Sequence, residues 1–347
     1  TNGKVIFDNI VSNSTVNGMS GNLVLNGTDT LSNALDNVVL NINTNNVVLN
    51  NKGLNSGRVS VAEGGELNIT NGGDIAISSE LAGNGLITKN GTGKVTLSGH
   101  RNDEFSGNIN INNGTVSFEK TNENLFIAVV TSNGANSKFE YTNSTSDTFD
   151  GNFAKVVLDN GGTVSISGGG SATTHNLSDG WLTSNGNSAN NIIFNSANYI
   201  LNTRYNRENI NDNIIFNSSN LTLGFNNTPD IDSNPSDYDL KGNNYTFNNS
   251  VLDLSNKIAG DNYNFDELDF TGSSGLALDI NLYLEKNDDG SIKVAPYADT
   301  ITANSGSGLV DITKLFITDD NGMFIDVSDE HENHQSKGII QIFKGNN

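Results

Sequence analysis

The sequence predicts an all-β protein, a parallel β-helix of about 15 stacked coils. Three observations predict it. Apolar residues alternate with polar ones at a period of two, which turns one side of each segment toward a core. Asn and Gly interrupt these segments at short intervals, as turn residues do. Related phrases also recur about every 22 residues, which is typical of a repeat architecture.

Short alternating segments follow one another along the chain, whereas no long stripe of helical spacing is present. Roughly 60 asparagines and 37 glycines supply residues that tolerate positive φ and make tight turns. Val, Ile, Leu and Phe keep the period of two, so we expect order rather than Asn-rich disorder. The expected strands lie in NLVLN (22–26), VVLNIN (38–43), RVSVAEGGELNIT (58–70), DIAIS (74–78), KVTLS (94–98), TVSFE (115–119) and KVVLDNGGTVSIS (155–167).

The clearest repeat joins three phrases. NNIIFNSANYIL at 190–201 returns as DNIIFNSSNLTL at 212–223, and YTFNNSVLDL at 245–254 aligns Phe247 with Phe216 and Phe194. A unit of about 20–25 residues with two or three short strands fits one coil, and coils stack about 4.8 Å apart. Inward residues would form apolar columns and corner asparagines would form ladders. An antiparallel sandwich or barrel is the alternative fold, and it would need hairpin turns between strands of matched length.

Composition divides the chain near residue 250. We expect 1–250 to hold β-helical repeats and 251–347 to be a more apolar β-helical segment. The second part has longer alternating stretches at 276–284 and 310–317, and NDDG at 287–290 reads as a turn between strands. The proline-containing stretch 226–244, just before it, is expected to be a loop that leaves the array.

Charge and cysteine content exclude several classes of protein. The chain has 347 residues, 18 basic against 39 acidic, a net charge of −21 and no cysteine. Nucleic-acid binders need Lys and Arg to neutralise phosphates, so we expect no nucleic-acid partner. Disulfides and thiolate metal sites are excluded. No stretch approaches the roughly 18 apolar residues of a membrane-spanning helix. The opening TNGKVIF suggests a mature product or a piece of something longer.

One stretch resembles a known family. GNGLITKNGTGKVTLSGHRNDEFSGNININNGTVSF, at 83–118, is similar to the passenger-associated transport repeat of bacterial autotransporters. The family often has Asn-Thr-Tyr where this chain has Asp103, Glu104 and Phe105. The stretch covers about a tenth of the chain, and its matching residues are Gly83, Gly85, Lys89, Gly91, Gly93, Leu97, Ser98, Gly99, Ser106, Gly107, Gly114 and Thr115.

The resemblance implies a passenger domain of type V secretion, with a right-handed parallel β-helix. It implies a surface or extracellular location at a Gram-negative-type outer membrane, with membrane contact only through the missing C-terminal barrel. Passengers of this family are mostly adhesins and self-association proteins, and some are proteases or esterases. The expected partners are therefore a host-cell surface, mucin or glycan, or a second copy.

A few side chains are candidates for ligand or metal contact. Trp181 is the only Trp, and an exposed indole on a loop stacks on sugar rings, although a lone Trp is more often packed in a core. Two arginines flank a tyrosine in NTRYNREN, which could bind an acidic or glycan ligand or be solvated. DIDSNPSD could hold calcium in a loose loop, but it departs from an EF-hand. These candidates are Trp181, Arg204, Tyr205 and Arg207 for ligand, and Asp230, Asp232 and Asn234 for calcium.

Catalytic patterns do not stand out. The chain has no G-x-S-x-G, and the acidic residues Asp266, Glu267, Asp269 and Asp279 show no pairing, since most such residues alternate outward along strands. We therefore expect a protein that is not an enzyme and has no cofactor other than the candidate calcium. The alternatives are a polysaccharide-active lyase or hydrolase on the same scaffold and a purely structural stalk.

Overall fold

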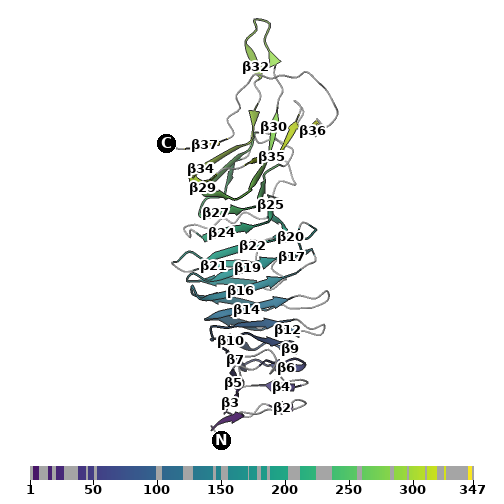
Figure 1. Cartoon of the computed structure of the whole chain (residues 1–347), viewed down its shortest axis with the longest axis vertical. Coiled ribbons are helices and arrows are strands. Elements are labelled where there is room, and N and C mark those ends of the chain that lie inside the picture. The colour runs from purple at the N-terminus through teal and green to yellow at the C-terminus, as the bar shows by residue number, and fades with distance from the viewer. Residues whose placement is uncertain are drawn as a thin grey trace. The chain divides into compact units, whose positions relative to one another are not determined.

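The computed structural model of this chain confirms the all-β prediction (Figure 1): strands and loops, without a helix, make up the residues that it describes. These are 3–7, 15–17, 21–26, 38–43, 46–50, 53–98, 104–119, 128–143, 146–149, 155–170, 172–177, 181–185, 188–201, 212–223, 237–255, 260–281, 285–294, 297–308, 311–318, 324–325 and 343–345. The chain divides into two compact units, Thr1–Asn195 and Ser196–Asn347.

Unit 1 is a stack of parallel coils. Its long sheet runs β1 (Gly3–Phe7), β3 (Gly21–Asn26), β5 (Asn46–Asn50), β7 (Glu66–Thr70), β10 (Leu86–Lys89), β13 (Asn108–Ile111), β15 (Val129–Asn133), β18 (Lys155–Asp159) and β21 (Leu182–Asn185). Its second sheet runs β8 (Ile75–Ile77), β11 (Lys94–Leu97), β14 (Gly114–Glu119), β16 (Ser137–Thr142), β19 (Thr163–Ser167) and β22 (Asn191–Asn195). A third sheet holds β2 (Thr15–Asn17), β4 (Val38–Ile42), β6 (Gly57–Val61), β9 (Glu80–Gly83) and β12 (Glu104–Phe105), and β17 (Asp147–Phe149) pairs with β20 (Thr174–Leu177).

Each coil of unit 1 pairs in parallel with the next, so the parallel β-helix is confirmed and the antiparallel alternative is wrong. The predicted count of about 15 coils is also wrong, because the coils stack through about 8 turns. The repeat is not uniform: Leu86 pairs with Asn108, 22 residues later, but Thr163 pairs with Asn191, 28 residues later. Residues that leave the coil in loops lengthen the repeat, so fewer coils form.

Period two sets the core of unit 1. Along β16 the burial alternates, so that Phe139 and Tyr141 point inward while Lys138 and Glu140 point outward. Register stacks the inward residues of successive strands into columns, and each buried apolar side chain of this size contributes about 1.5–3 kcal/mol. One column is Val95, Val116, Phe139, Val164 and Ile192, and a second is Leu97, Phe118, Tyr141, Ile166 and Phe194.

Unit 2 begins with the same kind of coil. One sheet joins β24 (Asp212–Asn217), β27 (Asn243–Asn248), β29 (Asn262–Thr271), β34 (Thr300–Ser307) and β37 (Phe343–Gly345), with β26 (Asp237–Asp239) beside β29. The other joins β23 (Asn198–Leu201), β25 (Asn220–Leu223), β28 (Val251–Asp253), β30 (Gly275–Asn281), β35 (Asp311–Thr318) and β36 (Phe324–Ile325), with β33 (Tyr297–Ala298) antiparallel to β30.

The predicted alignment of phenylalanines is confirmed in unit 2. Phe216 pairs in register with Phe247, and Phe247 with Phe270, a fourth copy that the sequence comparison missed. The ring centroids of the first pair are 4.9 Å apart and those of the second 5.5 Å, both stacked. The sequence comparison missed this copy because the corner after Phe270 differs from those of the earlier coils. It contains Gly272 in place of the Asn-Ser pattern and is one residue longer.

Strand length increases after the third copy of the repeated phrase. β29 has 10 residues and β35 has 8, against 4 in β25. The longer strands expected at 276–284 and 310–317 are present as β30 and β35. The NDDG turn is confirmed too: it joins β31 (Glu285–Lys286) to β32 (Ile292–Val294) in an antiparallel hairpin. The compact units meet at residue 195, and the division of the repeats from a C-terminal segment at residue 250 stays a prediction. The stretch expected as a loop contains β26 at its end.

Candidate binding surface

The outer side of the second sheet of unit 1 is an array of polar side chains, here called the polar face. It comprises the outward residues of β11, β14, β16 and β19, together with Asn191 and Asn195 of β22. Because the strands are in register, outward residues form columns as the inward ones do. One column runs Lys94, Thr115, Lys138, Thr163 and Asn191, and its neighbour runs Thr96, Ser117, Glu140 and Ser165. Within the second column, Ser117 and Ser165 are buried. Hydroxyl, amide and charged groups thus recur at the spacing of the coils.

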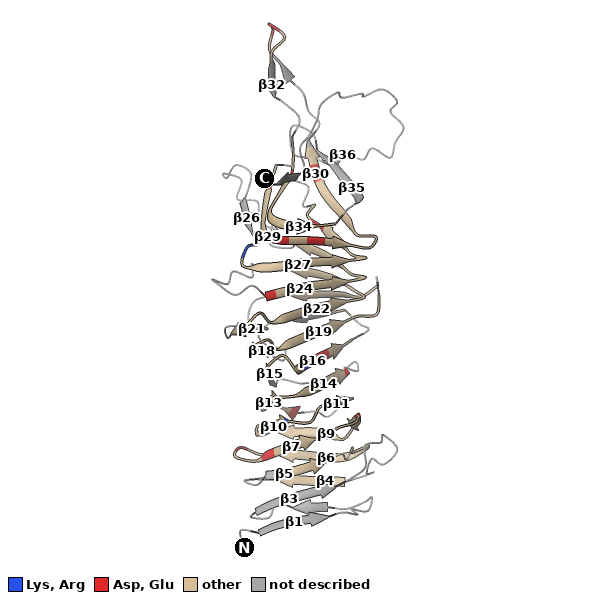
Figure 2. Cartoon of the chain, turned by 60° about the vertical axis from the view of Figure 1, so that its left-hand side comes forward, with Lys and Arg blue, Asp and Glu red and all other residues tan. Residues whose placement is uncertain are grey.

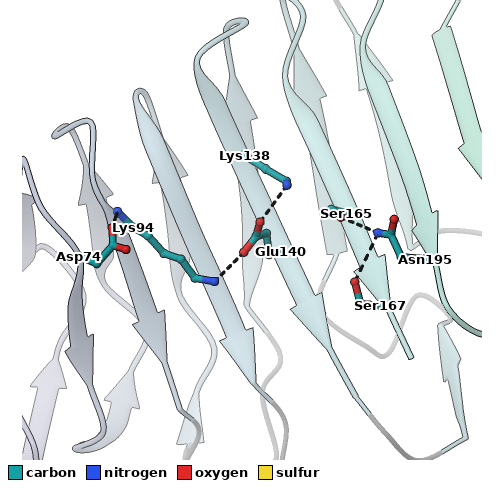
Figure 3. A network of polar contacts seen from close by, with 7 residues as sticks. All are labelled: Asp74, Lys94, Lys138, Glu140, Ser165, Ser167 and Asn195. Atoms are coloured by element: carbon teal, nitrogen blue, oxygen red, sulfur yellow. Dashed lines mark hydrogen bonds and ion pairs between the residues drawn. The ribbon is translucent and has the colours of Figure 1, made fainter. Parts of the chain in front are cut away.

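An ionic contact spans three strands of the polar face (Figure 3). Lys94 of β11 reaches past β14, and its Nζ lies 2.8 Å from Glu140 Oε2, while Lys138 Nζ lies 2.8 Å from Glu140 Oε1. Burial raises the pKa of the Glu140 carboxyl, but the two ammonium groups outweigh burial and hold the pKa below its usual value. Asp74 Oδ1 accepts a hydrogen bond of 2.9 Å from the backbone N–H of Lys94. Both ammonium groups of this cluster therefore share one carboxylate.

Hydroxyl groups farther along the polar face are joined by an amide. Asn195 Nδ2 is 3.0 Å from Ser165 Oγ and 3.3 Å from Ser167 Oγ, both on the preceding strand (Figure 3). An Asn amide carries two N–H donors, so one side chain serves both hydroxyls. Ser167 is half-buried, and its hydroxyl keeps a donor that a sugar or a second protein could use, whereas Ser165 is buried.

The expected ladders of corner asparagines are confirmed in both units. In unit 1, Asn112 Nδ2 donates to Asn90 Oδ1 at 2.9 Å, and Asn90 Nδ2 donates to Asn68 Oδ1 at 3.0 Å. In unit 2, Asn220 Nδ2 donates to Asn198 Oδ1 at 2.8 Å. An amide has a donor and an acceptor, so each can continue the chain of hydrogen bonds to the next coil. These asparagines stabilise the stack and are only partly free for ligand contact.

A second exposed charge cluster lies on the third sheet of unit 1. Arg58 of β6 forms an ion pair with Glu80 of β9, and its guanidinium also lies 3.9 Å from Glu104 of β12. Glu104 is one of the residues by which this chain departs from the transport repeat. Exposed pairs of this kind are worth only about 0–1 kcal/mol, so their role in stability is small.

The residues of the transport-repeat resemblance have a structural role. Lys89 lies in an inward column between Ile69 and Ile111 and is 0% exposed. Its Nζ donates to the carbonyls of Gly91 and Asn113, the latter at 3.2 Å, where the coil turns from the long sheet into the second sheet. Burial lowers the pKa of the Lys89 ammonium to about 8.

Glycines make room for this corner. A Cβ on Gly91 would lie 2.0 Å from the backbone oxygen of Asn71, and Gly114 has a φ of +76°. A Cβ on Gly114 would also lie 2.7 Å from Lys89 Nζ. The motif thus couples a buried lysine to glycines that let the backbone approach it.

Other coils fill the same corner with neutral groups. Asn71 Nδ2 donates to the carbonyl of Gly73 at 2.6 Å, and Ser137 Oγ donates to that of Gly134 at 2.7 Å. Asn190 Nδ2 donates to Asn185 O at 3.1 Å. The corner therefore requires a buried donor in each of these coils, and sequence reasoning missed it because Lys, Asn and Ser do not align as one residue type.

The structure places one of the four ligand candidates. Trp181 is buried at 1% exposure, beside β21, so its indole does not face solvent as a sugar-stacking group does. The expectation of an exposed, sugar-stacking Trp is thereby corrected, and the burial agrees with the alternative of a Trp packed in the core. The other candidates lie outside the described residues: Arg204, Tyr205 and Arg207 for ligand, and Asp230, Asp232 and Asn234 for calcium.

The acidic residues of unit 2 fall into two environments. Asp266, Glu267 and Asp269 are half-buried in β29, where strict alternation slips because the neighbours Asp266 and Glu267 both lie outside the core. Figure 2 shows acidic positions of this strand in red. Asp279, in contrast, is 0% exposed, in a strand whose residues 275–280 are all buried. Alternation fails there because β30 is covered on both sides. Among the described residues, no three His, Asp or Glu side chains are grouped as metal ligands.

No family model, curated protein or solved structure matches this chain. None of the described segments forms a helix with the length and apolar character that a membrane crossing needs. The assignment of a function therefore depends on the chain's own residues.

Proposed function

We propose that this chain is the surface-exposed passenger of a type V-secreted bacterial protein and acts as an adhesin or self-association domain. It binds without catalysis, through the polar face of unit 1. The polar face carries the proposal, because its hydroxyl, amide and charged groups repeat from coil to coil. Individual contacts of this kind are weak, but an array engaged at several places gains effective concentration at each further contact.

The chemistry of the polar face suits two kinds of partner. The half-buried hydroxyls of its threonines and of Ser167 can donate to and accept from the hydroxyls of a glycan or mucin. Lys94 and Lys138 stand beside Glu140, so positive and negative groups alternate over a short distance. A surface with both signs complements a second copy of itself when the two copies lie in opposite directions.

The passenger assignment rests on the transport-repeat residues. Lys89, Gly91 and Gly114 cooperate in one corner of the β-helix, with hydrogen bonds and close backbone contacts. A motif that builds a coil is the kind of motif a β-helical passenger family would keep. This supports the resemblance beyond matching letters.

Retention of the purified chain on immobilised mucin, matrix proteins and a polysaccharide panel tests the proposal, with sedimentation velocity for self-association. Thr96→Arg and Thr163→Arg place bulk and charge on the polar face. Thr131→Arg is the matched control, because Thr131 is equally half-buried and points outward from the long sheet. We expect saturable retention or self-association that falls at least tenfold in the first two variants and stays within twofold in the control.

Three outcomes contradict the proposal. Release of sugar from any retained polysaccharide would support the enzyme alternative. Absence of both retention and self-association would support the structural stalk. An equal loss in the Thr131→Arg control would move the binding surface away from the polar face. Circular dichroism of each variant separates loss of binding from loss of fold.

A further inference from the structure

Asp299 lies at a point where the chain of unit 2 changes its pairing partner. Just before it, β33 pairs antiparallel with β30, and just after it, β34 pairs parallel with β29. The residue is 0% exposed. Its backbone N–H donates to Asp279 O at 3.0 Å, so main chain and side chain both contact the neighbouring strand. Asp299 therefore sits where β29, β30 and β34 are joined.

The carboxyl group of Asp299 accepts three backbone hydrogen bonds. Oδ1 accepts from the N–H of Gly260 at 3.0 Å and of Asp261 at 3.1 Å, in the turn before β29. Oδ2 accepts from the N–H of Asp279 in β30 at 2.8 Å. Backbone groups that leave a strand ladder need such partners. The side chain thus ties two strands of different sheets together.

Two more carboxyl groups are buried beside it. Asp261 is 2% exposed and Asp279 is 0% exposed. They are the charged groups that act on Asp299, one from the turn before β29 and one from β30, and both are acidic. Three carboxylates of like charge cannot all remain ionised at low cost in a site removed from water. Burial raises the pKa of Asp299 to about 8, more than its backbone donors lower it.

We propose that Asp261, Asp279 and Asp299 together take up a proton from solvent as unit 2 folds, which makes this junction a pH-sensitive element of the fold. The proton is absent in the unfolded chain at neutral pH, where an Asp is ionised. A pKa raised on folding adds stability that is complete below the unfolded value of 3.8 and is lost as the pH rises through about 8. The junction is thus tightest in acid and loosens in alkali, independently of any binding by unit 1.

Carbon-13 NMR of the whole chain, labelled at the Asp carboxyl carbons, tests the proposal. We expect one carboxyl resonance with a titration midpoint near pH 8, and its disappearance in Asp299→Asn. Asp266→Asn, on the outer side of β29, is the control and should leave that resonance in place. If Asp299→Asn does not fold, Asp279→Asn should shift the midpoint to lower pH by removing one negative neighbour.

Hydrogen exchange gives a second readout. Between pH 6 and pH 9, after correction for intrinsic exchange, protection of β29, β30 and β34 should fall several-fold more than protection of β14. The Asp279→Asn variant should flatten this dependence. A carboxyl signal assigned to Asp299 that titrates below pH 5, or protection at the junction that does not depend on pH, would overturn the proposal.

Discussion

Units 1 and 2 each bury an ionisable side chain among backbone groups, and the two solutions are opposite in sign. In unit 1, the Lys89 ammonium donates to the carbonyls of Gly91 and Asn113. In unit 2, the Asp299 carboxyl accepts from three backbone N–H groups. A coil that turns a corner leaves backbone donors or acceptors outside the ladder, and the buried side chain supplies the missing complement. Whether the buried side chain is a donor or an acceptor therefore indicates which backbone group, C=O or N–H, lies outside the ladder at that corner.

The apolar cores differ as well. In the second sheet of unit 1 the two inward columns mix aliphatic and aromatic residues, and the ring pair Phe118 and Tyr141 is tilted, with centroids 6.0 Å apart. One column of unit 2 repeats a single residue type, and its rings Phe216, Phe247 and Phe270 stack. We expect the removal of one ring to destabilise a column of stacked rings more than it destabilises a mixed column.

The largest expected effect follows from this difference. Phe247→Ala removes the middle ring of the stack and leaves a cavity between two others, so it should cost about 3–5 kcal/mol of the free energy of unfolding. Hydrogen exchange should increase in β24, β27 and β29 and remain unchanged in β14. Phe118→Ala, equally buried in unit 1, is the matched comparison and should cost less. Equal losses for both variants would remove the distinction between the cores.

Lys89 gives the next largest effect. Lys89→Ala leaves two corner carbonyls without their donor, at about 1–3 kcal/mol for each buried unsatisfied group. Lys89→Met keeps the apolar length of the side chain and isolates the loss of the hydrogen bonds. Urea unfolding, followed by exchange in β10 and β11, measures both. If the two variants were as stable as the parent chain, the corner would not need a buried donor.

The two buried ionisable groups, Lys89 and Asp299, predict opposite responses of stability to pH. Folding lowers the pKa of Lys89 from 10.5 to about 8, so the folded chain binds fewer protons than the unfolded chain in that range, and unit 1 gains stability as the pH rises through it. Unit 2 loses stability up to about pH 8 because the pKa of Asp299 is raised. Exchange at β10 and at β30, measured from pH 6 to pH 10, should therefore change in opposite directions. Lys89→Met should remove the rise in unit 1 only, and slopes of one sign in both units would contradict the comparison.

A smaller effect is expected at the corner of unit 2 next to the phenylalanine stack. Ser250 is 1% exposed, and its Oγ donates to Phe216 O at 2.9 Å and accepts from the N–H of Ser219 at 3.0 Å. Ser250→Ala should cost about 1–2 kcal/mol, because it leaves a buried N–H and a buried carbonyl with one partner fewer. Ser273→Ala, at an exposed position of the next coil, is the control and should change unfolding by less than about 0.5 kcal/mol.

Most of the fold could be predicted from the sequence, because period two and the repeated phrases report the inward columns directly. The alignment of Phe216 with Phe247 has the register that the phrases predict. The number of coils could not be predicted, since it depends on how many residues leave each coil, and loop length has no periodic signal. The boundary between the units is equally invisible, because the same repeat lies on both sides of residue 195.

The candidate site was less predictable. The outward columns of the polar face follow from alternation, but the contact between Lys94 and Glu140 crosses an intervening strand and joins residues 46 positions apart. Trp181 and Asp279 show the limit of reasoning from residue type. A lone Trp reads as a loop contact or as core, and an Asp at an outward position reads as solvated until a further layer covers it. Coverage of a strand on its second side is a property of the fold, not of the strand's own residues.

The smallest expected effect belongs to the exposed charges. Glu140→Gln breaks the ion pairs to Lys94 and Lys138, and pairs this accessible are worth about 0.2–1 kcal/mol each. The loss should shrink at 1 M salt, since the Debye length there is about 3 Å. Folding lowers the pKa of Glu140, so its contribution is present at neutral pH and is lost as the pH falls through that lowered value.

A double-mutant cycle of Lys138→Ala and Glu140→Gln, measured by urea unfolding at low and high salt, gives the coupling free energy of the pair. Lys155→Ala, which changes an exposed lysine of the long sheet, is the control. A coupling as large as the cost of Lys89→Met would mean that the polar face holds the coils together. A small, salt-sensitive coupling would mean that the buried charges maintain the fold and that the charges of the polar face remain available to a partner.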